Sequence, residues 1–239
     1  MSDRRIFKVL CLHGYRQNSQ IFKTKSGGFR KILKNRIEFN FIDAPHLIPK
    51  VFEQNQIKIL VGLSWWFSGE NPDYFSSKHV SNFVQGFDQS LEKIHNIFVE
   101  QGPFDGLLGF SQGASMIALI CILQQLGEFK HHFDFVILCS SFKSLTKTHL
   151  ELFDRLGEQK LSIKSLHIIG ETDQIVDPSR SESLAETYFK NPSIIKHPGG
   201  HIVPSQTIYR DSYHRFLDSI YHENEQTSEN IFKKSKHQI

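Results

Sequence analysis

The pentapeptide Gly109-Phe110-Ser111-Gln112-Gly113 constrains the fold more than any other stretch of this sequence. It follows a short apolar run, Phe104 to Phe110, and precedes a run without helix breakers, Gln112 to Leu126. A strand is therefore expected to turn directly into a helix at Ser111. A residue at such a turn has a strained backbone, and glycine two positions to either side lets strand and helix approach closely. The pattern predicts a nucleophile elbow with Ser111 at its tip, and the alternative is a tight turn with an inert serine.

Predicted strands and helices alternate along the rest of the chain. Continuous apolar runs indicate buried strands, and apolar residues spaced three and four apart indicate helices. We expect strands at Ile6–Leu12, Ile37–Ile42, Phe104–Phe110, Phe133–Cys139, Leu166–Ile169 and Ser193–Lys196, and helices at Phe22–Leu33, Val80–Phe98, Gln112–Leu126, Ser179–Phe189 and Gln206–Tyr221. This order predicts a mostly parallel, doubly wound sheet with helices on both faces. Together with the elbow at Ser111, it predicts an α/β-hydrolase fold.

The domain organisation expected from length is simple. The chain has 239 residues, and α/β folds of this size are often built around one sheet, so we expect a single domain over residues 1–222. Residues 47–75 have no sustained period and are expected to form an irregular excursion from the sheet. Residues 223–239 are polar and are expected to form a disordered tail.

Composition excludes several classes of protein. The net charge is +3, with 28 basic and 25 acidic residues scattered along the chain, which disfavours a nucleic-acid partner. Cys11, Cys121 and Cys139 lie in apolar segments and are interpreted as buried thiols of a reducing compartment. The N-terminal apolar run is too short for a secretory signal, and no stretch could span a bilayer. We expect a cytoplasmic protein, with the nucleus also open, and no stable membrane insertion; the sequence does not determine the oligomeric state.

A serine nucleophile needs a histidine base, and His201 is the candidate. A serine hydroxyl is a weak nucleophile until a base accepts its proton. His201 follows Gly199-Gly200 after the last predicted strand, and this glycine loop gives the imidazole reach over the sheet. His197 lies at the edge of its strand, and His13 is expected to be held beneath the first loop.

The base needs a carboxylate to orient it, and Asp173 is the candidate. It follows the predicted strand Leu166–Ile169, at the sheet edge where open α/β folds build their sites. Glu171 and Asp177 compete for the role. Asp177 precedes a proline, so it is better suited to capping the next helix.

Two backbone N–H groups are expected to stabilise the oxyanion of the transition state. Gln112, directly after the nucleophile, supplies the first. The loop His13-Gly14-Tyr15-Arg16 supplies the second, with Tyr15 preferred as the donor and Arg16 as the alternative.

With these residues in place, the chain resembles the FSH family of serine hydrolases. The resemblance is carried by Val9–Asn18, Trp65–Ser68, Gly102–Ala114 and Gly199–His201 with Pro204. It implies hydrolysis of small-molecule carboxylic esters, mainly long-chain alkyl or acyl esters and also thioesters, through the triad argued above and an acyl-enzyme intermediate. We expect neither a metal nor an organic cofactor. One departure is Glu171, where the family usually carries Asp, and it leaves Asp173 untouched.

The aromatic cluster Trp65-Trp66-Phe67 is the candidate lining of the substrate pocket, with Trp65 and Trp66 as substrate-binding residues. Ordinary core packing of large aromatic rings is the alternative. Two other functions were weighed. A non-catalytic ligand-binding protein could keep the same fold, whereas a nucleotide-binding protein is disfavoured because neither a G-x-x-x-x-G-K-[ST] loop nor a G-x-G-x-x-G fingerprint occurs.

Overall fold

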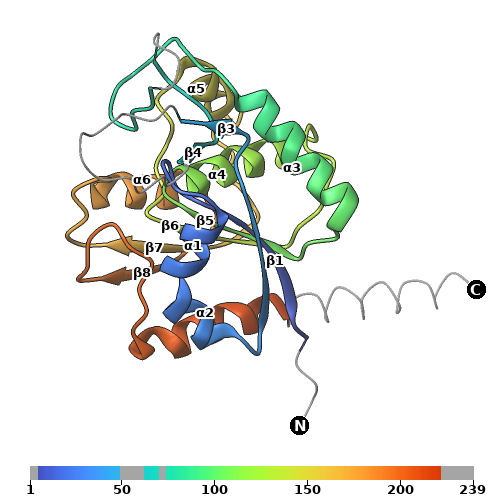
Figure 1. Ribbon diagram of the computed structural model, residues 1–239, viewed down its shortest axis with the longest axis vertical. Helices are drawn as coiled ribbons and strands as arrows, with labels where there is room; N and C mark the ends of the chain where they lie inside the picture. Colours follow the sequence, from blue (N-terminus) through green and yellow to red (C-terminus); the bar gives the residue numbers. More distant parts are fainter. Residues whose placement is uncertain (1–4, 49–61, 70–73, 222–239) are drawn as a thin grey trace, which may run out of the picture.

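The computed structural model describes residues 5–48, 62–69 and 74–221 (Figure 1). Within these residues, six parallel strands form one sheet in the order β2-β1-β5-β6-β7-β8. Their bounds are β1 Phe7–Leu12, β2 Ile37–Ile42, β5 Gly106–Phe110, β6 Phe135–Cys139, β7 Lys164–Gly170 and β8 Ser193–His197. The order runs outward from β1 in both directions, which confirms the doubly wound α/β-hydrolase architecture.

Helices cover both faces of this sheet (Figure 1). One face carries α1 (Ser19–Lys25), α2 (Gly27–Leu33) and the helix of residues 210–221, which the 3-10 turn η1 (Thr207–Tyr209) precedes; the other carries α3 (Phe87–Gln101), α4 (Gln112–Gln125), α5 (Lys147–Asp154) and α6 (Pro178–Tyr188). Strand β1 shows why both faces must be covered. Val9 and Cys11 enter one hydrophobic core, while Leu10 and Leu12 enter the other.

The first predicted helix is two helices in the structure. Ser26 has a non-helical ψ of 9°, and its hydroxyl and N–H both donate to the carbonyl of Phe22, at 2.7 and 2.9 Å. The change in ψ at Ser26 ends α1 at Lys25, and α2 begins at Gly27. A serine that bonds back to its own helix competes with the next helical turn.

The helix predicted from Val80 begins only at Phe87. Gln85 exchanges two backbone hydrogen bonds with Phe67, so this segment is extended. Gly86 then turns the chain with a φ of 89°, against the ring of His46. The prediction was therefore wrong for residues 80–86, which are not helical. Apolar spacing alone did not reveal that Gln85 pairs with Phe67, a residue distant in the sequence.

Three further elements, β3, β4 and α5, were not predicted. The expected irregular excursion contains β4 (Leu63–Ser64), which pairs antiparallel with β3 (His46–Leu47). Helix α5 was also missed; it spans only eight residues. Residues 49–61 and 70–73 of the excursion, and the predicted tail 223–239, lie outside the described residues.

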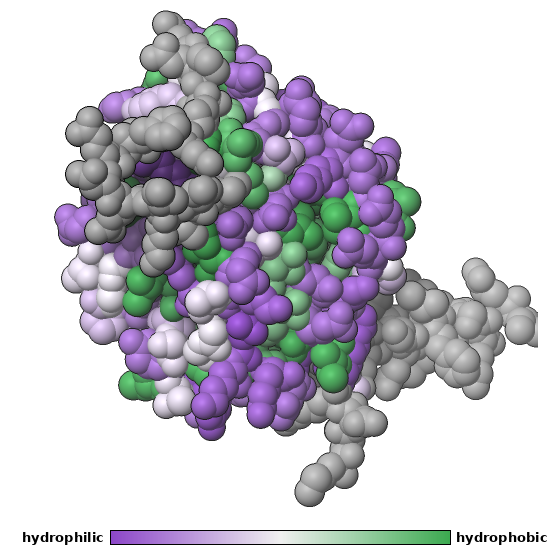
Figure 2. All heavy atoms as spheres, viewed as in Figure 1, coloured by the Kyte–Doolittle hydropathy of each residue, from purple (hydrophilic) through white to green (hydrophobic). Residues whose placement is uncertain are grey.

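The cysteines lie in the two cores, and the surface is largely polar. All three cysteines are buried and unpaired, as predicted. Hydrophilic side chains cover much of the face seen in Figure 2, with apolar side chains between them. No helix in the described part of the chain is both long and apolar enough to cross a bilayer.

Candidate active site

Ser111 lies at the sharp turn between β5 and α4. Its φ is 53° and its ψ is −116°, a strained conformation for a residue with a side chain. A Cβ on Gly109 would lie 2.5 Å from the Cα of Ala114, and one on Gly113 would lie 2.3 Å from the carbonyl oxygen of Leu12. A side chain at either position would clash with the backbone, so both residues must be glycine. They allow α4 to pack tightly against β1 and β5, with Ser111 at the turn between strand and helix.

The side chain of Gln112 has a role that its sequence position did not suggest. It is fully buried, and its Oε1 accepts a hydrogen bond from the backbone N–H of Trp65 at 3.0 Å. Its Nε2 donates to the carbonyl of Trp66 at 2.8 Å and to the hydroxyl of Ser64 at 3.2 Å. Gln112 thus ties the start of α4 to the segment that follows β4.

Asp173 and His201 meet at the carboxyl edge of the sheet. The Oδ2 of Asp173 lies 2.7 Å from the Nδ1 of His201, while its Oδ1 accepts the N–H groups of Ile175 and Val176, each at 2.9 Å. Because the carboxylate engages Nδ1, Nε2 is the nitrogen left to exchange a proton with another group. The ring of His201 packs against Phe110, the residue before Ser111, with centroids 4.7 Å apart.

The electrostatics of Asp173 favour its ionised form. Burial alone would raise its pKa, but the hydrogen bonds from His201 and from the backbone N–H groups of Val176 and Ile175 outweigh burial and lower the pKa below its ordinary value. The competing carboxylates lie elsewhere. Asp177 caps α6 by accepting from the N–H of Ser179 at 2.9 Å, as the sequence indicated, and Glu171 is exposed.

The competing histidines are held by backbone groups. His13 is buried between the carbonyl of Gly14 and the N–H of Ala44, at 2.8 and 3.0 Å. Accepting from Ala44 fixes Nε2 as the unprotonated nitrogen, and burial lowers the pKa of His13 to about 4. His197 is also buried and accepts from the N–H of Gly199. Neither histidine lines the pocket at Ser111.

Ser111 and His201 open onto one pocket of about 430 Å³. Its lining comprises Gly14, Tyr15, Gln17, Phe75, Ser76, Ser77, Lys78, Phe110, Ser111, Phe142, Ile175, Val176 and His201. The hydroxyl of Ser111 makes no hydrogen bond within the described residues. Catalytic hydrogen bonds often form only when substrate binds. Three of the lining residues, Tyr15, Ser111 and His201, were predicted from the sequence to have a functional role. Most of the remaining wall comes from separate loops whose convergence no local pattern predicts.

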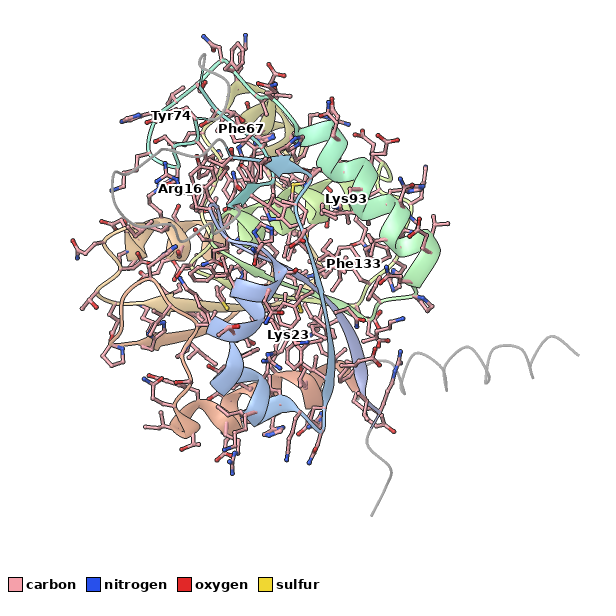
Figure 3. All side chains as sticks on the ribbon, in the orientation of Figure 1. Arg16, Lys23, Phe67, Tyr74, Lys93 and Phe133 are labelled. Carbon is pink, nitrogen blue, oxygen red and sulfur yellow. The ribbon has the colours of Figure 1, made fainter. Side chains whose placement is uncertain are left out.

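The loop after β1 lies against Ser111. A Cβ on Gly14 would lie 3.3 Å from the Cβ of Ser111, and Tyr15 lines the pocket. The N–H of Arg16 donates to the carbonyl of Leu63 at 3.0 Å, so this group is already engaged. Of the two donors considered for this loop, Tyr15 is the one that borders the pocket. Figure 3 shows Arg16 on the same side of the molecule as Tyr74.

Trp65 and Trp66 lie behind the pocket and do not border it. Both rings are fully buried. The indole N–H of Trp65 donates to the carbonyl of His13 at 2.8 Å, and Trp66 packs edge-on against Phe75 with centroids 5.4 Å apart. Phe75, in contrast, does line the pocket. The described contacts of the two tryptophans are therefore those of core residues that support the wall.

The chain is similar in sequence to known serine hydrolases and esterases. A family model described as Serine hydrolase (FSH1) matches residues 1–213. Esterase OVCA2 of Xenopus tropicalis is 38% identical over 222 residues, which are 91% of this chain and 94% of that protein. Esterase C25G4.2 of Caenorhabditis elegans is 38% identical over 219 residues, covering 91% of this chain and 95% of the relative.

Solved structures resemble the fold at low sequence identity. SOBER1 of Arabidopsis thaliana, as its L63A variant, matches with a TM-score of 0.61 and 16% identity, covering 91% of this chain and 100% of that one. Acyl-protein thioesterase 2 of Zea mays matches with a TM-score of 0.57 and 16% identity, covering 90% and 96%. At this level of identity, the likeness establishes the α/β-hydrolase fold alone.

Proposed function

The chain belongs to the FSH1 family of serine hydrolases, and we propose that it hydrolyses carboxylic esters with Ser111 as nucleophile, His201 as base and Asp173 as the orienting carboxylate. The observation that carries this assignment is the shared pocket. Ser111 and His201 both border it, and His201 is bonded through Nδ1 to a buried carboxylate. The imidazole is thereby oriented with Nε2 as its proton-accepting atom.

The reaction follows from these positions. His201 Nε2 accepts the hydroxyl proton as Ser111 Oγ bonds to the carbonyl carbon of the ester, giving a tetrahedral intermediate. The backbone N–H groups of Gln112 and Tyr15 stabilise its oxyanion. The protonated His201 then donates the proton to the departing alcohol or thiol, leaving an acyl group on Ser111. Water, deprotonated by His201, cleaves this acyl-enzyme and restores the serine.

The pocket supports esters with an apolar portion as substrates. Phe75, Phe142 and Val176 provide apolar surface beside Ser111. We propose that hydrocarbon of the acyl or alkyl group packs here, with Trp66 supporting Phe75 from behind. On this basis Phe75→Ala lowers kcat/KM for octanoyl esters more than for acetyl esters, whereas equal losses contradict the assignment of this wall.

Covalent labelling tests the nucleophile. A fluorophosphonate probe should label the wild-type protein and leave Ser111→Ala unlabelled, and the same variant should lose hydrolysis of p-nitrophenyl butyrate. Ser212→Ala, on the helix of residues 210–221, is the matched control and should be labelled normally. Labelling that persists in Ser111→Ala would assign the reaction to another serine of the pocket, Ser76 or Ser77. Ligand binding without turnover of any ester would favour a binding protein.

A further inference from the structure

The charges around the pocket are unevenly distributed. Among the described residues that line it, Lys78 is the side chain with a permanent charge, and no carboxylate is present. Lys78 follows Phe75, Ser76 and Ser77 along one wall, so this wall changes from apolar to polar and then to cationic. Two hydrogen bonds hold the backbone of this wall: Ser76 N–H donates to Ser68 Oγ at 2.9 Å, and Lys78 N–H donates to Ser76 Oγ at 3.2 Å. The side chain of Lys78 is exposed.

A second cation lies directly behind the same wall. The guanidinium of Arg180 donates to the carbonyl and hydroxyl of Ser77 and to the carbonyl of Lys143, and it stacks 5.2 Å from the ring centroid of Phe142. Ser77 and Phe142 both face the pocket. Burial lowers the pKa of Arg180, but a guanidinium stays protonated at neutral pH.

Among residues 5–48, 62–69 and 74–221, no carboxylate forms an ion pair with the cations of this wall, Lys78, Arg180 and Lys143. The ammonium of Lys143 donates to the hydroxyl of Tyr188 at 2.6 Å. Asp177 interacts with Arg180 electrostatically without an ion pair, and its carboxylate accepts hydrogen bonds from Ser179. Arg180 is therefore a half-buried charge held by neutral acceptors, and an anion bound beside it would gain Coulombic attraction.

We propose that the preferred substrate carries an anionic group, a carboxylate or a phosphate, which lies against the wall formed by Ser77, Lys78 and Arg180. This inference rests on the proposed function, since it places the anion in the same pocket as the scissile carbonyl. The apolar rings hold the hydrocarbon, and the positive field of the wall attracts and orients the charged end. The anion belongs either to the acyl chain or to the leaving group.

Two substrate pairs distinguish these sources. p-Nitrophenyl hydrogen glutarate and p-nitrophenyl pentanoate have acyl chains of equal carbon number, and only the first carries a carboxylate. Butyryl-coenzyme A and S-butyryl-N-acetylcysteamine share an acyl group, and only the first has phosphates on its leaving group. For each pair we compare the kcat/KM of the anionic substrate with that of the neutral one. For at least one pair, this ratio should be about tenfold lower in Lys78→Glu than in the wild type. Lys31→Glu, the same change on α2, should leave both ratios unchanged.

Binding provides a readout that does not depend on catalysis. Calorimetry with Ser111→Ala should detect the hydrogen glutarate or butyryl-coenzyme A, and adding Lys78→Glu should weaken that binding about tenfold. Unchanged ratios in Lys78→Glu, together with unchanged binding, would overturn the anionic-substrate proposal while Ser111-dependent hydrolysis of the neutral esters stands. Absence of that hydrolysis would instead overturn the proposed function, and the binding result would still decide the role of the wall.

Discussion

Replacing Gln112 with Met tests how the start of α4 is held. Methionine has nearly the same volume but no amide, so the main change is loss of hydrogen bonds. The N–H of Trp65 loses its acceptor in a fully buried site, whereas the carbonyl of Trp66 keeps the hydroxyl of Ser64 at 2.6 Å. One orphaned donor and one lost bond together predict a loss of about 3 kcal/mol in the free energy of unfolding.

Urea unfolding followed by tryptophan fluorescence measures this loss directly, because both tryptophans of the chain are adjacent to the changed contacts. Gln101→Met, an exposed change on α3, is the control and should alter stability by less than about 0.5 kcal/mol. Ester hydrolysis should fall at least about tenfold, because the backbone at residue 112 is no longer tied to its neighbour. A loss of stability below about 1 kcal/mol with normal activity would refute the clamping role of Gln112.

The remaining predictions concern Asp173, the buried His13, and Gly113 beside the turn at Ser111. Asp173→Asn should lower kcat/KM by about 10³-fold or more, since the amide favours the wrong imidazole tautomer, whereas Asp177→Asn, which keeps a helix cap, should retain activity. The contribution of buried neutral His13 to stability should be full above pH 6.5 and should fall toward pH 4, where the folded protein also protonates this histidine. Between these pH values the unfolded state binds about one more proton at His13 than the folded state, and His13→Gln should remove this proton from the pH dependence of the unfolding free energy. Gly113→Ala should cost about 3 kcal/mol or prevent folding, because the methyl group meets two carbonyl oxygens, whereas Gly27→Ala meets no atom within 4 Å and should be tolerated in a thermal melt.

Local pattern was sufficient for the order of the six strands of the sheet and for the strand-to-helix turn at Ser111. Buried parallel strands are continuous apolar runs, and a nucleophile elbow needs glycines at fixed spacing, so both leave a signal within a few residues. The same reasoning placed His201 and Asp173 after neighbouring strands. Parallel strands end at one edge of a sheet, and the two side chains do meet there.

Tertiary structure alone decided the contacts between segments that are distant in sequence. Trp65 and Trp66 were candidates for the pocket surface, but their rings are buried and Phe75 borders the pocket instead, a choice that depends on how the loops stack. The engagement of Arg16 with Leu63, the clamp formed by Gln112 and the cationic wall around Ser77 likewise depend on partners far along the chain. A sequence specifies local conformation through nearby residues, whereas packing and electrostatic fields are set by the whole fold.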